Sequence, residues 1–169
     1  FQTIANSALT ISGNVSTSIV AGAVDPSNGS YLFGRFRTGA SDLWRYTEGA
    51  STPFAYIGYV ATTGSPNGNG DMAFDARGNL YVVGAATVGS ASSATIYTVT
   101  AETLAAASGG TLAVGSSSTK ALLGTDAAFA NINGIAFSPR GTVYLANAGS
   151  AYEFDATTWT RVPNTARVA

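Results

Sequence analysis

An internal repeat constrains the fold of this chain more than any other feature. Three ten-residue segments, which begin at Ala23, Ala73 and Ala136, read alike. Each contains a small and an apolar residue, then Asp or Ser, a short turn with Gly, and a Tyr near its end. The Asp or Ser side chain can hydrogen-bond within its own turn, and Gly tolerates the positive φ of a chain reversal. The repeat therefore predicts three equivalent β-hairpins.

The pattern continues beyond each hairpin with two further strands. Third strands with alternating apolar residues are predicted at 43–47, 96–100 and 151–155, and fourth strands at 54–60, 121–124 and 158–162. The second and third hairpin segments match without a gap, whereas the first carries one extra turn residue. The period of two predicts one buried face per strand. We therefore expect three units of four antiparallel strands.

Helical spacing is not sustained anywhere in the sequence. The stretch 101–107 can form a helical turn, which Gly109 and Gly110 would stop. Two stretches rich in Gly, Ser and Ala, at 84–94 and 108–119, make the middle unit longer. Their composition predicts mobile loops within one domain.

The repeat resembles a known structural unit. Residues 133–147 (Asn-Gly-Ile-Ala-Phe-Ser-Pro-Arg-Gly-Thr-Val-Tyr-Leu-Ala-Asn) are similar to an NHL or gluconolactonase-type β-propeller repeat, and residues 70–84 resemble the same unit. Over residues 20–162 the chain resembles propeller regions of large, repetitive bacterial cell-surface proteins of the actinobacterial type. The resemblance implies an architecture rather than a function, because propellers have many unrelated roles.

The fold class expected from the repeat and the resemblance together is all-β, with about three propeller-type blades. The single domain 1–169 divides into an N-terminal strand segment and three blades, at 1–19, 20–60, 70–125 and 133–162. Closed propellers usually have four to eight blades. We therefore expect an incomplete propeller that is a fragment of a longer protein, or one that another copy completes. The strand expected at Ala8–Gly13 would pair with 158–162 or with a strand of another copy.

Composition excludes several partners and points to a location. Charged residues are 10% of the chain and the net charge is −1, so no basic field is available for nucleic acid. No apolar run reaches the roughly 20 residues of a membrane helix, so membrane insertion is not expected. The chain has no cysteine and one lysine, Lys120, and is rich in Ser, Thr, Asn and Gly. Such surfaces are common in exported bacterial proteins, which favours an extracellular or cell-surface location.

The sequence predicts no catalytic residue, no cofactor and no metal ligand. Histidine and cysteine are both absent, which removes the commonest general base and nucleophile–base pairs. A gluconolactonase-like enzyme would need acidic and Asn side chains around a metal, and the candidates by position are Asp25, Asp71, Asp75, Asn133 and Asn147. Asp25 and Asp75 align with Ser138 at a turn, so a turn-capping role explains all three. Asp71 and Asn147 are interpreted as loop residues.

Aromatic residues are the remaining candidates for a contact surface. Trp44, Tyr97 and Tyr152 share one position on the third strands, which favours packing between blades over stacking on sugars. Tyr56, Tyr59 and Trp159 fall on fourth strands, where we expect exposure, and they are the predicted partner-contact residues.

The function favoured by these observations is a non-enzymatic extracellular module for adhesion or assembly. Its partner would be a protein or further copies of the chain, with carbohydrate as a further possibility. The alternatives are a structural subunit that polymerises into an extracellular fibre or sheath, and a metal-dependent lactonase-like hydrolase. The sequence does not identify the ligand.

Overall fold

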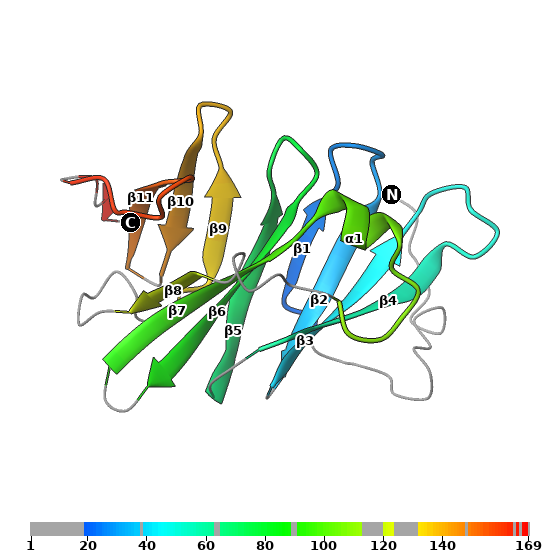
Figure 1. The fold of residues 1–169 in the computed structure, drawn as a ribbon, viewed down its shortest axis with the longest axis horizontal. Helices are drawn as coiled ribbons and strands as arrows, with labels where there is room; N and C mark the ends of the chain where they lie inside the picture. Colours follow the sequence, from blue (N-terminus) through cyan, green and yellow to red (C-terminus); the bar gives the residue numbers. More distant parts are fainter. Residues whose placement is uncertain are drawn as a thin grey trace.

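The chain forms three antiparallel sheets of four strands each, in chain order (Figure 1). The computed structural model describes residues 19–37, 39–62, 65–88, 91–112, 120–123, 132–147, 149–163, 165 and 167–168. The expected strand Ala8–Gly13 lies outside these residues. The all-β class and the division into three units of four antiparallel strands are confirmed. Among the described residues, no helix is long and apolar enough to span a membrane.

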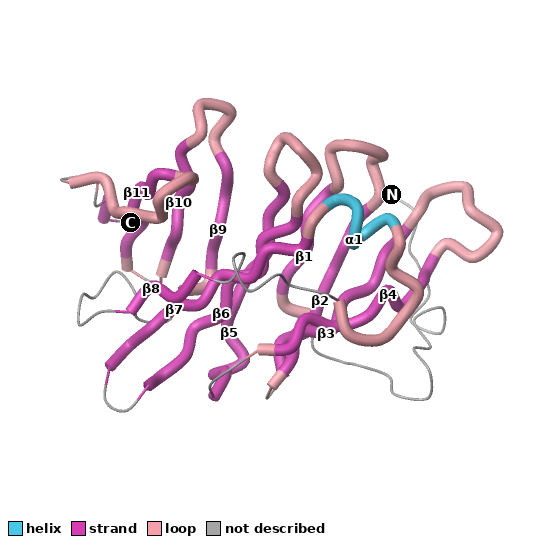
Figure 2. Tube along the Cα trace, viewed as in Figure 1, coloured by secondary structure: helices cyan, strands magenta, loops and turns pink. Residues whose placement is uncertain are grey.

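The strands follow the repeat. The first sheet consists of β1 (Ala21–Val24), β2 (Tyr31–Arg37), β3 (Ala40–Tyr46) and β4 (Phe54–Ala61). The second consists of β5 (Ser65–Phe74), β6 (Leu80–Val88), β7 (Ala91–Val99) and β8 (Lys120–Leu123). The third consists of β9 (Gly134–Phe137), β10 (Thr142–Ala146), β11 (Ser150–Asp155) and β12 (Arg167–Val168). The helix α1 (Ala101–Ala105) follows β7 (Figure 2), as the sequence predicts for this stretch.

Each hairpin turn is held by the side chain that opens it. The backbone N–H groups of Arg77 and Asn79 each donate to Asp75 Oδ1, both at 2.9 Å. Gly78 has a φ of 79°, which glycine adopts without strain. The equivalent Ser138 Oγ accepts from the Arg140 N–H at 3.0 Å. The predicted turn-capping role is thus confirmed for both residues.

The first hairpin differs in register from the other two. Its turn is one residue longer. The Asp25 N–H donates to the carbonyl of Ser30, five residues on, whereas the Asp75 N–H donates to the carbonyl of Asn79, four residues on. Tyr31 therefore lies opposite Val24, the last residue of β1, whereas Tyr81 lies opposite Ala73. A shift of one residue moves a side chain to the other face of a strand. The extra turn residue expected in the first hairpin is thus confirmed, and Leu32 takes the position that Tyr81 and Tyr144 hold in the other two.

The sheets pack face to face in chain order, and the first strands β1, β5 and β9 are neighbours (Figure 1). We call the face of a sheet toward the following sheet its forward face, and the opposite one its backward face. The forward face of the first sheet, with Leu32 and Leu43, meets the backward face of the second, with Leu80, Val82 and Tyr97, and all five are buried.

A glycine lets the first two sheets approach closely. A Cβ on Gly34 would lie 2.6 Å from the Met72 Cε and 3.0 Å from the Asp42 carbonyl oxygen, so a larger residue would require the end of the Met72 side chain to move. The loop after α1 also joins them, because the Tyr59 N–H donates to the Gly110 carbonyl and the Leu112 N–H to the Tyr59 carbonyl. Gly58, with a φ of 131°, makes room for that carbonyl.

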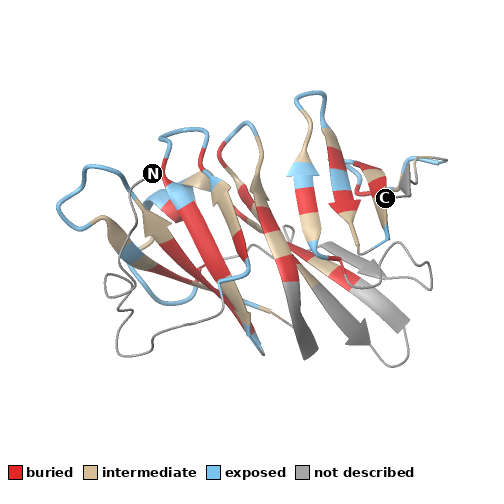
Figure 3. Cartoon of the chain, turned by 180° about the vertical axis from the view of Figure 1, so that it is seen from behind, coloured by how far each residue is buried: buried red, intermediate tan, exposed pale blue. Residues whose placement is uncertain are grey.

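The second interface repeats the first with different side chains. The forward face of the second sheet, with Val83 and Ile96, meets the backward face of the third, with Leu145, Tyr152 and Phe154. Figure 3 shows how buried positions alternate with less buried ones along the strands of the third sheet. The expected packing role of Tyr97 and Tyr152 between sheets is confirmed by their places in the two cores. Each interface also receives apolar side chains from the segment after a third strand, with Leu104 of α1 and Leu112 at the first interface and Trp159 at the second.

Two predicted boundaries are wrong. The fourth strand expected at 158–162 is reduced to a bridge between Arg161 and Phe154, and β12 pairs with β11 further along the chain. The turn at Asp155, whose carboxylate accepts the N–H groups of Thr157 and Thr158, occupies the beginning of the expected strand. The loop expected at 84–94 is mostly strand, because β6 and β7 continue their pairing to Val88 and Ala91.

Candidate binding surface on the first sheet

The backward face of the first sheet carries a continuous group of aromatic rings. Phe33 stacks on Trp44 with ring centroids 6.0 Å apart, and Trp44 lies 5.6 Å from Tyr56. Tyr31 stacks on Phe33 at 5.9 Å, toward the hairpin end of the same face. Trp44 shares its strand position with Tyr97 and Tyr152 but packs within its own sheet. Phe33 and Trp44 are buried, whereas Tyr31 is 42% exposed.

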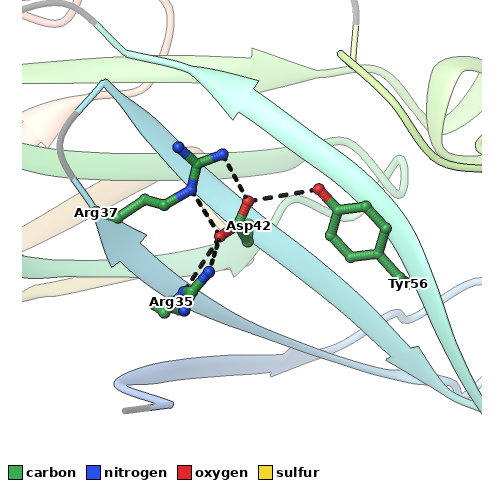
Figure 4. A network of polar contacts seen from close by, with 4 residues as sticks. All are labelled: Arg35, Arg37, Asp42 and Tyr56. Atoms are coloured by element: carbon green, nitrogen blue, oxygen red, sulfur yellow. Dashed lines mark hydrogen bonds and ion pairs between the residues drawn. The ribbon is translucent and has the colours of Figure 1, made fainter. Parts of the chain in front are cut away.

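A buried carboxylate organises the polar part of this face (Figure 4). Asp42 on β3 is 3% exposed and lies opposite Arg35 of β2 in the register. Arg35 Nη2 donates to Asp42 Oδ2 at 2.6 Å, and Arg37 Nε donates to the same oxygen at 2.8 Å. Arg37 Nη2 reaches Asp42 Oδ1 at 3.1 Å, and the Tyr56 hydroxyl lies 3.4 Å from it.

Two opposing effects set the pKa of Asp42. Burial acts to raise it, but the hydrogen bonds and positive charges of Arg37 and Arg35 outweigh burial and lower the pKa below its ordinary value. The carboxylate therefore stays charged at neutral pH. Two guanidinium groups against one carboxylate leave this cluster with one net positive charge.

The arginines also contact the aromatic rings. The Arg35 guanidinium lies 5.9 Å from the Trp44 ring centroid, and that of Arg37 lies 5.5 Å from the Tyr59 ring. We call Arg35, Arg37, Tyr56 and Tyr59 the arginine–tyrosine surface. The side chains of Arg35 and Arg37 are 28% and 44% exposed. The Asp42 carboxylate holds both guanidinium groups in place, so a ligand would meet them with little loss of side-chain freedom.

The predicted partner-contact residues divide into two groups. Tyr56 and Tyr59 are half-buried and lie together on this surface. Trp159 is 8% exposed, so the exposure expected for it is wrong. Its ring packs 5.8 Å from that of Tyr81, because the turn after β11 gives Trp159 a left-handed φ of 58° and directs it into the second interface. Arg35, Arg37 and Asp42 are not identified as site residues from the sequence. The spacing of two between Arg35 and Arg37 is the pattern that places both side chains on one face of a strand.

The Asp and Asn residues considered as metal ligands make hydrogen bonds within the fold. Asp25 accepts the Ser27 N–H at 2.8 Å and the Asn28 side-chain amide at 2.9 Å, as its predicted turn-capping role requires. Asn147 follows β10 as expected and accepts the Ser150 N–H at 3.0 Å. The Asn133 N–H donates to the Ala146 carbonyl. Among the described residues, no group of three or more Asp, Glu, His or Cys side chains could hold a metal ion.

Asp71 was expected in a loop, but it lies in β5 and joins two sheets. Its Oδ2 accepts the Ile135 N–H of β9 at 3.0 Å. Burial raises the pKa of Asp71, and the backbone N–H groups of Ile135 and Met72 oppose that change only in part.

A separate cavity of about 280 Å³ lies between the first hairpin turn and α1. Its lining includes Asp25, Asn28, Ser30 and Arg45. Ser30 is 5% exposed, and its Oγ has no hydrogen-bond partner, nor has the buried Nε of Arg45. Arg45 Nη2 donates to the Leu104 carbonyl at 2.7 Å, which fixes the guanidinium at the cavity wall.

Comparison with protein-family models finds no family that matches this chain, and comparison with curated proteins finds no match either.

Proposed function

We propose that the chain is a non-enzymatic binding and assembly module of propeller-type blades that works outside the cell or at the cell surface. The arginine–tyrosine surface is its contact site. The single observation that carries this proposal is the Asp42 network, which presents two arginines and two tyrosines on the outer face of the first sheet. Tyr, Trp and Arg are the residue types that dominate binding energy at interfaces.

The blade assignment is supported by the way the sheets repeat. The second sheet packs its backward face on the first sheet and its forward face on the third, and the first strands are neighbours. In a propeller the first strands of the blades surround a central axis, and faces pack in this sequence around it. The extracellular location is supported by the single lysine among 169 residues and by the abundance of Ser, Thr, Asn and Gly.

Binding to coated surfaces tests the function. Beads that carry the chain are measured against surfaces coated with the chain itself, with a neutral polysaccharide and with an acidic polysaccharide. We expect saturable binding to at least one of them. The double variant Arg37→Ala, Tyr56→Phe should weaken it about tenfold, because it removes a guanidinium and a hydroxyl from the contact site.

The matched control is Arg140→Ala, which removes an exposed arginine from the third hairpin turn. It should bind like the unaltered chain. Equal binding by the double variant and the control would reject the arginine–tyrosine surface. Absence of binding to every surface, or metal-dependent hydrolysis of a lactone by the chain, would reject the proposed function.

A second candidate function is binding of a small hydroxylated molecule in the α1 cavity. The observation that favours it is the pair of buried unpartnered donors, Ser30 Oγ and Arg45 Nε, at the wall of one cavity. A sugar hydroxyl can accept from both groups. Saturation-transfer NMR with monosaccharides tests this function, and we expect the signal to disappear in Ser30→Val. A signal unchanged by that substitution would reject the site.

A further inference from the structure

The forward face of the third sheet repeats a pattern that is covered elsewhere in the chain. On the second sheet, Tyr81 lies opposite Ala73 and Thr98 in the register. On the third sheet, Tyr144 lies in the same way opposite Ala136 and Glu153. The two faces therefore present a tyrosine beside an alanine at the same place in the repeat.

The structure shows what covers this pattern on the second sheet. The ring of Tyr81 contacts Phe137 at 4.6 Å, and Phe137 is the last residue of β9, directly before the hairpin turn. The corresponding pair at the first interface is Leu32, which is fully buried, and Phe74, the last residue of β5, which packs against the same core. The same two positions therefore belong to the core at both interfaces.

The equivalents of these two positions at the ends of the stack are exposed. Tyr144 on the forward face of the third sheet is 38% exposed. Val24, the last residue of β1 on the backward face of the first sheet, is 60% exposed, and its neighbour Tyr31 is 42% exposed. The two ends of the stack therefore leave exposed the positions that are covered at both internal interfaces.

We infer that the forward face of the third sheet docks on the backward face of the first sheet of a second copy, with Tyr144 against Val24 and Tyr31. This inference rests on the proposed blade assignment and names a partner for the face that carries the arginine–tyrosine surface. Two copies of three sheets form a ring of six, within the four to eight of closed propellers, whereas three copies would give nine. The assembly is therefore a dimer in which both copies use the same pair of faces.

Sedimentation over a wide range of concentration tests the dimer. We expect a mass of twice the 17.0 kDa chain at high concentration, with dissociation on dilution. Tyr144→Arg should raise the dimer dissociation constant about tenfold or more, because it places a charge in the apolar contact. Thr157→Arg, in an exposed turn of the same sheet, is the matched control and should leave the constant unchanged.

A cross-link identifies the faces. The chain has no cysteine of its own, so Val24→Cys and Tyr144→Cys chains can be mixed and oxidised. We expect a disulfide-linked pair that contains one chain of each kind, formed faster than either homodimer.

A mass of one chain at every concentration, or a dimer that Tyr144→Arg does not weaken, would overturn the inference. A larger or open assembly would overturn the ring of six. If the chain is monomeric while beads that carry it still bind a polysaccharide through the arginine–tyrosine surface, the second copy is rejected and the proposed function stands.

Discussion

The forward faces of the second and third sheets carry the same pattern but have different surroundings. Tyr81 lies beneath Phe137 and Trp159, whereas Tyr144 is 38% exposed. The alternation that places both tyrosines is identical, and only the presence of a following sheet differs. Burial at such a position therefore depends on the neighbouring sheet and not on the strand itself. The contribution of each side chain to the free energy of unfolding should depend on whether a neighbouring sheet covers it.

The largest effect is expected where the covered face is opened. Trp159→Ala should lower the free energy of unfolding by about 3–5 kcal/mol, because it removes a buried ring between two sheets. Tyr144→Ala, on the open face, should change it by less than about 0.5 kcal/mol at concentrations where the chain is monomeric. Urea unfolding of both variants checks this contrast, and similar losses in the two would contradict it.

At the other end of the stack, stability on the outer face depends on charge. Asp42→Ala should lower the free energy of unfolding by about 2–3 kcal/mol at pH 7. The two guanidinium groups lose their buried carboxylate partner while remaining partly hydrated.

This contribution of Asp42 also depends on pH. Because the pKa of Asp42 is lowered by folding, its contribution is complete above the ordinary pKa of 3.8 and is lost as pH falls below that value. Urea unfolding is measured at pH 7 and at pH 2.5, with Thr157→Ala as the control. The difference in free energy of unfolding between Asp42→Ala and the unaltered chain should be smaller at pH 2.5. A constant difference would contradict the ion-pair account.

The hairpin turns allow a reciprocal exchange between the two similar sheets. Asp75 accepts two backbone N–H groups and the Tyr81 hydroxyl, whereas Ser138 Oγ accepts the Arg140 N–H. Asp75→Ser should therefore lower the free energy of unfolding by about 1 kcal/mol. Ser138→Asp should leave the free energy of unfolding unchanged or raise it slightly. Thermal unfolding of both variants tests the exchange, and a greater loss for Ser138→Asp than for Asp75→Ser would contradict the equivalence of the turns.

The smallest effect concerns the polar link across the covered face. The raised pKa of Asp71 means that the folded chain favours the protonated form, so its contribution falls as pH rises above the ordinary value of 3.8. Asp71→Asn keeps an acceptor for the Ile135 N–H and removes the charge. The variant should be as stable as the unaltered chain at pH 4, and slightly more stable at pH 7. A loss of stability at pH 7 that is absent at pH 4 would show that the charged form is favoured instead.

The sequence predicts most strands because the repeat specifies local alternation and turn chemistry together. The extra turn residue of the first hairpin, which moves Tyr31 to the other face from Tyr81, is also read from the sequence. The sequence misplaces Trp159, whose direction is set by a left-handed turn that alternation does not encode. Of the candidate surface, Tyr56 and Tyr59 are identified from the sequence. The arginines are not, because their importance depends on the pairing of β2 with β3 around Asp42.

The most direct test of the stacked arrangement is a double-mutant cycle between Tyr81 and Phe137, whose rings lie 4.6 Å apart across the second interface. Tyr81→Ala, Phe137→Ala and the double variant are unfolded in urea at one temperature and pH. If the third sheet packs on the second as described, the two substitutions are coupled by about 0.5–1.5 kcal/mol. The matched cycle between Tyr144 and Phe137, which lie on opposite faces of the third sheet, should give a coupling near zero. Additive effects for Tyr81 and Phe137 would contradict the face-to-face packing from which the contact site and the dimer are inferred.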